Sequence, residues 1–302
     1  MTDGSGDGPE NGPDVLCAGH VNWDVTLRVD RLPDRDGEAR IDERVQSPGG
    51  SAANVATVLG GLDAAPLLLG SVGTDEHADM VRRELRARGV ETRLVECDGE
   101  TTVKYLVVDA DGEVFVLGNE GVNEGFGPGD LPAERLVGTD HLHLTGQSAA
   151  TAGQLAREAA SAGVTVSFDP GRRLTDRDYD EALAHTDVLF CNDREAGTAV
   201  SERTVESIPT VVVKHGSGGA EALTDDRTVS HPGFAVDPVD STGAGDAFAG
   251  GFLAARLRDE PLDRALAVGN ACGALATREM GARLTVEWRD VEALLDIGPR
   301  EV

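Results

Sequence analysis

The chain has 302 residues, of which 40% are hydrophobic, and it carries a formal net charge of −27 at pH 7. This length and apolar content can supply a substantial core, in one large α/β domain or in two smaller ones. The negative charge argues against a nucleic-acid partner, because phosphates would be repelled. An acidic chain with only two lysines favours a protein kept soluble in concentrated salt, and an ordinary acidic cytosolic protein is the alternative.

The sequence gives no sign of secretion, membrane insertion or a cysteine-based metal site. The four cysteines are scattered and none forms a C-x-x-C pair, so we interpret them as small buried residues in a reducing compartment. No apolar run reaches the length of a membrane span, and residues 1–13 lack the basic and apolar parts of a signal peptide. We therefore predict a cytoplasmic protein with no membrane partner, and a short disordered leader at residues 1–13.

Strand-like and helix-like segments alternate along most of the chain. Buried strands are predicted from the opening of 14–27 and over 65–73, 140–146, 164–170, 187–192 and 210–216. Helices are predicted over 49–62, 76–90 and 150–163, and the chain after residue 242 is predicted to be mainly helical. Such alternation predicts a mainly parallel sheet that is covered by helices on both faces.

Two segments, at about 25–46 and 99–120, break this rhythm. Polar and apolar residues alternate in both, and the second contains the turn sequence "DADGE" at 109–113. We predict that they form antiparallel ribbons outside the main sheet and act as a lid.

The segment "DSTGAGDAFAGGF" (240–252) joins three small residues to a carboxylate and an apolar helical run. Thr242 or a neighbour can cap a helix whose first turn is Gly243, Ala244, Gly245 and Asp246. Backbone N–H groups of such a turn can approach a ligand closely and favour the negative charge of a transferring phosphoryl group. Asp246 can accept the proton of a substrate hydroxyl. A tightly packed helix start with an acidic residue at its positive end is the alternative interpretation.

Four motifs, in order along the chain, resemble those of the ribokinase-like (PfkB-type) family of sugar and nucleoside kinases. They are "GHVNWD" (19–24), "PGGSAANVA" (48–56), "NDRE" (192–195) and "DSTGAGDAFAGGF". The resemblance implies a ribokinase-like three-layer α/β/α fold, with a mainly parallel central sheet and a small β-strand lid, in one kinase domain over 14–302. Together with the composition it suggests a halophilic archaeal source. No G-x-x-x-x-G-K-[ST] sequence is present, so the chain is not a P-loop enzyme.

Residues near the N-terminus are the candidates for sugar binding. Asn22 and Asp24 are two positions apart on a strand, so they share one face, and their amide and carboxylate suit vicinal hydroxyls. The resemblance implies that they bind the sugar, whereas a solvated polar pair is the alternative. Gly49 and Gly50 allow close backbone approach to the sugar, and Asn54 lies one helical turn later, where it can hydrogen-bond the sugar.

Three further residues bear on the choice of sugar. Gln147 follows a strand at a place where members of the family have an acidic or polar residue near the sugar. Arg173 in "FDPGRR" resembles the arginine of the family's D-P-N-x-R segment, with Gly171 in place of the usual asparagine. If Lys104 faces inward from the lid, it places a cation over the sugar, which suits a keto-deoxy acid or ribose 1-phosphate. Otherwise Lys104 is a lysine on the lid surface.

The resemblance also implies a nucleotide site in the C-terminal half. It assigns Asn192 and Glu195 to Mg²⁺, largely through water, although Glu195 can equally be a first-turn helix acid. Lys214, in a strand followed by a glycine loop, is a candidate for a nucleotide phosphate contact. The other residues that resemble the family's nucleotide site or its monovalent-cation site are Gly216, Gly219, Gly243, Gly245 and Asn270 for the nucleotide, and Asp240 and Thr242 for K⁺. A lone helical asparagine such as Asn270 is also commonly a packing or capping residue.

The combined interpretation is an ATP- and Mg²⁺-dependent sugar kinase that phosphorylates a primary hydroxyl of a pentose or related sugar, including one already phosphorylated. A nucleoside kinase on the same fold and a non-catalytic sugar- or nucleotide-binding protein are the alternatives. Exposed lid strands can pair edge to edge, so a homodimer through the lid is expected.

Overall fold

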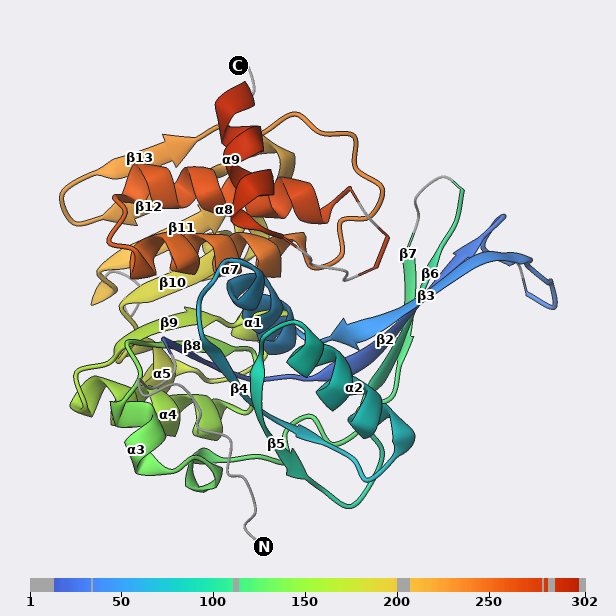
Figure 1. The fold of residues 1–302 in the computed structure, drawn as a ribbon, viewed down its shortest axis with the longest axis horizontal. Coiled ribbons are helices and arrows are strands. Elements are labelled where there is room, and N and C mark those ends of the chain that lie inside the picture. The colour runs from blue at the N-terminus through green and yellow to red at the C-terminus, as the bar shows by residue number, and fades with distance from the viewer. Residues whose placement is uncertain are drawn as a thin grey trace, which may run out of the picture.

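The computed structural model describes residues 14–33, 35–110, 114–199, 207–278, 280–281 and 286–298. The predicted leader at 1–13 and residues 111–113 of the predicted lid turn lie outside these ranges. Within them, two sheets and two groups of helices form the molecule (Figure 1).

The larger sheet has nine strands in the order β13-β12-β11-β10-β9-β8-β1-β4-β5. Its strands are β1 (Val15–Ala18), β4 (Pro66–Val72), β5 (Glu91–Glu96), β8 (His141–Thr145), β9 (Thr165–Asp169), β10 (Val188–Asn192), β11 (Thr210–Lys214), β12 (Ala220–Thr224) and β13 (Thr228–His231). The run from β11 to β5 is parallel, and β12 and β13 extend one edge in antiparallel fashion.

Helices cover both faces of this sheet, as the sequence predicted. They are α1 (Ser51–Gly61), α2 (Glu76–Ala87), α3 (Ala133–Val137), α4 (Ala149–Ser161), α5 (Asp180–Leu183), α6 (Asp193–Ala199), α7 (Ala244–Leu257), α8 (Leu262–Ala276) and α9 (Trp288–Ile297), with 3₁₀ segments η1 (Pro128–Asp130), η2 (Gly171–Thr175) and η4 (Gly216–Gly218).

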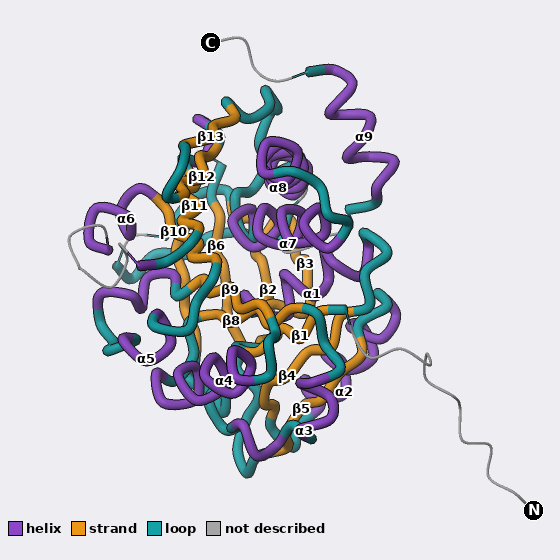
Figure 2. Tube along the Cα trace, turned by 90° about the vertical axis from the view of Figure 1, so that its left-hand side faces the viewer, coloured by secondary structure: helices purple, strands orange, loops and turns teal. Residues whose placement is uncertain are grey.

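Two hydrophobic cores correspond to the two faces of the sheet. One core joins the sheet to α1, α2, α7, α8 and α9, and the other joins it to α3, α4 and α5. In Figure 2, α4 and α5 lie on the opposite side of the strands from α7 and α8. The arrangement confirms the predicted three-layer fold class. Of the described residues, no helix has the length and apolar character needed to cross a membrane.

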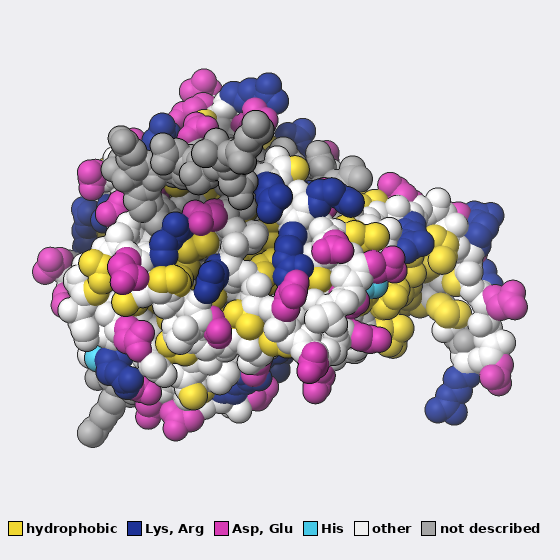
Figure 3. Space-filling model, turned by 60° about the horizontal axis from the view of Figure 1, so that its bottom comes forward, with side chains coloured by type: hydrophobic (Ala, Val, Ile, Leu, Met, Phe, Trp, Pro, Cys, Tyr) yellow, Lys and Arg dark blue, Asp and Glu magenta, His cyan; other side chains and the backbone are white. Residues whose placement is uncertain are grey.

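The smaller sheet projects from the body as an arm (Figure 1). Its strands, in the order β3-β2-β6-β7, are β2 (Asn22–Val29), β3 (Ile41–Gly49), β6 (Val103–Val108) and β7 (Val114–Gly118). Each half is an antiparallel hairpin, and β2 pairs with β6 in parallel. Hydrophobic side chains gather along this arm on the face that Figure 3 shows.

The strand predicted at the opening of 14–27 is confirmed by β1, and the chain then changes sheets within this segment. β1 belongs to the large sheet, and β2 belongs to the arm. The four residues of β1 are all apolar or small and are all buried. From Asn22 onward, polar and apolar residues alternate, so this strand cannot be covered by hydrophobic helices on both faces. The change of sheet brings β2 across the end of the large sheet.

Candidate active site

Helix α7 begins with the small residues that the sequence singled out. The helix starts at Ala244, and Gly243 is its N-cap with φ of 75°, a left-handed conformation that glycine adopts without strain. Of the predicted caps, Thr242 or a neighbour, the neighbour Gly243 takes the N-cap position, and no side chain of the described residues caps the helix. The Ala244 N–H donates to the Ser241 carbonyl at 3.2 Å, so the N–H groups of Gly245 and Asp246 are the ones that can meet an anionic ligand.

Asp246 lies in the first turn of α7 and is half-buried. Its Oδ2 accepts a hydrogen bond of 2.7 Å from Nδ2 of Asn54 in α1. Burial raises the pKa of Asp246 and the charge of Asp169 adds to this effect, whereas Asn54 and the Lys214 ammonium act in the opposite direction. Asn54, which we expected to bind the sugar, therefore uses one of its two amide N–H groups to orient this carboxylate.

Asp24 and Lys104 face one another across the arm. They are register partners in the parallel pair of β2 and β6, so their side chains share one face. Asp24 is buried, and its pKa is raised to about 6 by burial, with the Lys104 ammonium opposing that rise. A Cβ atom on Gly49 would overlap the Asp24 carboxylate. The glycine therefore makes room for Asp24, where we had expected direct approach to a sugar.

Several buried polar atoms at the base of the arm lack a protein partner. Asn22 is fully buried, and its Oδ1 accepts a bond of 2.6 Å from Asn123. Among the described residues, its Nδ2 and Asp24 Oδ1 have no hydrogen-bond partner. Both amide atoms of Gln147, which is also fully buried, lack one too. Because an unsatisfied buried polar atom is costly, these atoms are candidates for contacts with a bound polar ligand.

Positive charge gathers beside Asp24. Burial lowers the pKa of Lys104, and the charges of Arg173 and Arg172 lower it further, while Asp24 and Asp246 raise it. Lys104 is half-buried, so it is not the surface lysine of the alternative interpretation. Lys104 therefore lies opposite Asp24 and within electrostatic reach of Arg172, Arg173 and the candidate base, Asp246.

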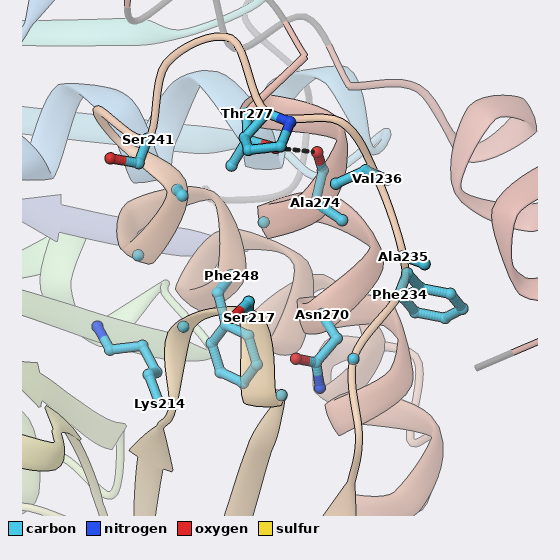
Figure 4. Close-up of a pocket in the computed structure, with 17 residues that line it drawn as sticks. Lys214, Ser217, Phe234, Ala235, Val236, Ser241, Phe248, Asn270, Ala274 and Thr277 are labelled. Carbon is cyan, nitrogen blue, oxygen red and sulfur yellow. Dashed lines mark hydrogen bonds between the residues drawn. The ribbon is translucent and has the colours of Figure 1, made fainter. Parts of the chain in front are cut away.

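A cavity of about 390 Å³ opens on the other side of α7. The predicted nucleotide residues that line it are Lys214, Gly216, Gly219, Gly245 and Asn270, whereas Gly243 does not, and Ala244 of the predicted first turn also lines it. Figure 4 shows Phe248 and Asn270 at the cavity, with Lys214 to one side. The remaining wall is mainly apolar and comes from residues 233–238 and α8. Asn270 donates from its amide nitrogen to the Leu266 carbonyl of its own helix at 2.8 Å, so it also contacts the helix backbone.

Lys214 connects this cavity to the base. Its Nζ donates to Asp169 Oδ2 at 2.5 Å, and it lies close to Gly245 in the first turn of α7. Burial alone would lower the pKa of Lys214, but the Asp169, Asp246 and Glu195 carboxylates outweigh that effect and raise it.

The predicted metal residues form local caps. Asn192 and Glu195 make reciprocal hydrogen bonds of 2.9 to 3.0 Å at the start of α6, which is a capping box. Asp240 is buried and accepts from the backbone N–H groups of Thr242 and Gly281. Among the described residues, no group of three or more His, Cys, Asp or Glu side chains could hold a metal ion.

The structure thus brings the sugar-side and nucleotide-side candidates together around Asp246. Residues at or just after the carboxyl ends of parallel strands, where α/β sheets bind ligands, contribute Gln147, Asp169, Asn192 and Lys214. The sequence analysis missed Asp169, His20, Arg172 and Glu124. Asp169 is the first residue of the segment compared with D-P-N-x-R and Arg172 stands at its unspecified position, but the sequence analysis assigned a role only to Arg173.

Comparison with known proteins identifies the family and the fold of this chain. The ATP-dependent ribose-1-phosphate kinase of Halopiger xanaduensis is 57% identical over 278 residues, which are 89% of this chain and 93% of that protein. A nucleoside kinase of Methanothermobacter thermautotrophicus is 28% identical over 90% of this chain and 92% of its own length. The crystal structure of ribokinase from Thermotoga maritima has a TM-score of 0.81 at 21% identity, covering 94% of this chain and 99% of that one.

The family model described as pfkB family carbohydrate kinase matches residues 13–289. The ribokinase-like resemblance noted from the motifs is thereby confirmed. The chain belongs to the pfkB family of carbohydrate kinases, and it is a phosphotransferase that acts on an alcohol group.

Proposed function

We propose that this enzyme transfers the γ-phosphoryl group of ATP to the primary hydroxyl of a sugar 1-phosphate, with ribose 1-phosphate as the first candidate. The observation that carries the proposal is the half-buried Lys104, which is the register partner of Asp24 and lies within electrostatic reach of Arg172, Arg173 and Asp246. A neutral sugar gives no reason to gather three cations there, whereas a phosphate does. The 57% identical relative from Halopiger xanaduensis is named as a ribose-1-phosphate kinase, which supports the same substrate.

The sugar would lie between the arm and α1. Asp24 and Asn22 offer a carboxylate oxygen and an amide nitrogen that have no hydrogen-bond partner among the described residues, and these suit adjacent hydroxyls. Gln147 offers a further amide with both atoms unsatisfied. An anionic group bound near Lys104 would offset the burial that lowers the pKa of this ammonium.

ATP would occupy the cavity beside α7. Its mainly apolar wall suits a flat base, and positive-φ glycines such as Gly216 and Gly219 let the backbone of the η4 turn approach closely. A Cβ on Gly219 would overlap the backbone of His231 and Pro232. Lys214 lies between this cavity and Asp246, so its ammonium can bridge from Asp169 to a phosphate oxygen.

Asp246 acts as the general base in this scheme. It takes the proton from the sugar hydroxyl as that oxygen bonds to the γ-phosphorus and the bond to the β,γ-bridging oxygen breaks, which releases ADP. The hydrogen bond from Asn54 holds the carboxylate in place, and the N–H groups of Gly245 and Asp246 favour the charge on the transferring group. Closure of the arm would exclude water and limit ATP hydrolysis.

The residues that would hold metal ions all belong to the nucleotide side of the site. Mg²⁺ would neutralise charge on the phosphates, and Glu195 with Asn192 would hold it through water, since both Glu195 oxygens already accept from Asn192. The K⁺ site at Asp240 and Thr242 stays a prediction. The two backbone hydrogen bonds to the Asp240 carboxylate support an anchoring role for that side chain. A cytoplasmic location likewise stays a prediction.

A substrate panel tests the proposal. ATP turnover would be measured in molar KCl with ribose 1-phosphate, ribose, 2-keto-3-deoxygluconate, fructose, adenosine and cytidine. We expect the highest kcat/KM with ribose 1-phosphate. A preference for adenosine or cytidine would instead identify a nucleoside kinase. Ligand-dependent thermal shifts without ADP release for every compound would identify a binding protein.

We also propose that the arm pairs with a second copy of the chain. On β6 and β7 the pairing register puts Tyr105, Phe115 and Leu117 on one face, and these side chains are 43%, 52% and 52% exposed. An exposed apolar sheet face of this kind indicates a protein contact. The same pairing would hold the arm in place over the sugar.

A further inference from the structure

We propose that Glu124, His20 and Arg177 form a relay of hydrogen bonds that holds Arg173 toward the anionic group of the substrate, and so sets the preference for a phosphorylated sugar. The inference deepens the proposed function and rests on it. Glu124 and Arg177 belong to no motif that the sequence analysis used, and His20 lies in "GHVNWD" without having been given a role there.

The relay connects three separate parts of the chain. Arg177 Nη1 donates to Glu124 Oε1 at 2.7 Å, and His20 Nε2 lies 3.2 Å from the same oxygen. On its other side, His20 Nδ1 lies 3.1 Å from Arg173 Nη1. His20 comes from the β1–β2 connection, Glu124 from the segment after β7, and Arg177 from the segment after η2.

The donor directions follow from chemistry. A guanidinium only donates, so His20 Nδ1 must accept from Arg173, and its Nε2–H is then the donor to Glu124. The Glu124 carboxylate thereby selects the imidazole tautomer that Arg173 needs. Arg177 supports this state, since its hydrogen bond and charge help to lower the pKa of Glu124 against the opposing effect of burial. His20 is itself buried, and burial followed by the charge of Arg173 lowers its pKa to about 4, so it stays neutral near pH 7.

This arrangement leaves Arg173 ready for an anion. Its Nη1 is engaged by His20 Nδ1 and by the Gly146 carbonyl at 3.0 Å, which fixes the plane of the guanidinium. Neither acceptor is a carboxylate, so the positive charge is oriented without being neutralised. A guanidinium held in this way has its other edge available for a bidentate contact with phosphate. Lys104 and Arg172 supply the neighbouring charges.

The test compares variants of the relay on two sugars. Kinetics with ribose 1-phosphate and with ribose would be measured for the wild type, His20→Leu, His20→Asn and Glu124→Gln. We expect His20→Leu and Glu124→Gln to raise KM for ribose 1-phosphate by about tenfold, the effect of one charge-assisted hydrogen bond. KM for ribose and KM for ATP should change little. His20→Asn keeps an acceptor near the Nδ1 position, so it should restore most of the preference. Glu292→Gln, which breaks the exposed Arg264–Glu292 pair of 2.7 Å between α8 and α9, is the matched control.

A second measurement does not depend on turnover. The ¹⁵N shifts of His20 should report the Nε2–H tautomer in the wild type and a mixture of tautomers in Glu124→Gln. If the wild type prefers ribose 1-phosphate and the variants keep that preference unchanged, the relay is rejected while the proposed function stands. If the wild type itself prefers ribose, the proposed substrate fails and the specificity role fails with it. An Nδ1–H tautomer in the wild type would reject the relay whatever the substrate.

Discussion

Asp246 is the residue on which the proposed chemistry depends. Asn54 holds it from one side and Lys214 acts on it from the nucleotide side, so the carboxylate lies where the two substrates would meet. The raised pKa that burial gives it makes it a better proton acceptor than an exposed aspartate, provided that it is ionised at the working pH.

Replacing Asp246 by Asn should therefore lower kcat by about 10²–10⁴-fold, the usual contribution of a general base. The amide keeps nearly the same shape, so KM for ATP should change little. Steady-state kinetics on the preferred sugar would measure both constants. Asp263→Asn, at an exposed position in the first turn of α8, serves as the control and should behave as the wild type. Near-normal turnover of the Asp246 variant would remove this residue from the role of base.

Burial of the Asp24 carboxylate in the sugar site lowers the stability of the fold at neutral pH. Because burial raises its folded-state pKa to about 6 from an ordinary 3.8, the ionised carboxylate destabilises the fold at neutral pH. This cost is absent at low pH, grows as the pH rises from 3.8 to about 6, and is constant above that.

Asp24→Asn should therefore increase the free energy of unfolding, and more so at pH 8 than at pH 4.5. The expected difference between the two pH values is about 2 kcal/mol, from roughly 1.4 kcal/mol per pKa unit. Denaturant unfolding in molar KCl at both pH values would measure it. Sugar affinity should fall in the same variant. A stability gain that is the same at both pH values would contradict the burial of an ionised Asp24.

At the scale of elements, the sequence predicted the segments well and their partners poorly. The alternation of strand-like and helix-like segments was enough to predict the parallel sheet and its helices. The small residues at 243–245 were enough to predict the start of α7. Contacts such as Lys214 with Asp169 or His20 with Glu124 join residues 45 and 104 positions apart. Strand order and register decide those contacts, and neither can be read from local composition.

The junction of β2, β3 and α1 gives a prediction at this scale. Gly49→Ala would place a methyl group against the Asp24 carboxylate, so the strand pair or the carboxylate must shift. We expect KM for the sugar to rise by about tenfold and the free energy of unfolding to fall by about 1–3 kcal/mol, as for an overpacked site. KM for ATP should hold, since Gly49 does not line the nucleotide cavity. Gly129→Ala, where nothing lies within 4 Å of the added methyl, is the control. Equal changes in both KM values would indicate general distortion.

At the scale of the whole molecule, charge and the apolar arm act against one another. A net charge of −27 makes two copies repel, whereas the exposed side chains of β6 and β7 favour their association. In about 1 M salt the screening length falls to roughly 3 Å, so repulsion is suppressed while apolar contacts persist. The acidic composition and the proposed dimer are thus compatible only at high salt.

Sedimentation at several KCl concentrations would measure how the oligomeric state depends on this balance. We expect a dimer at about 2 M KCl that dissociates as salt is lowered toward about 0.1 M, because the screening length grows to roughly 10 Å. Phe115→Asp adds a charge to the apolar face of the arm and should give a monomer even at high salt. Val137→Asp adds the same charge to α3, where the side chain is 65% exposed, and should leave the dimer intact. If Phe115→Asp stays dimeric while Val137→Asp does not, the contact lies on the body of the molecule, and closure of the arm needs no second copy.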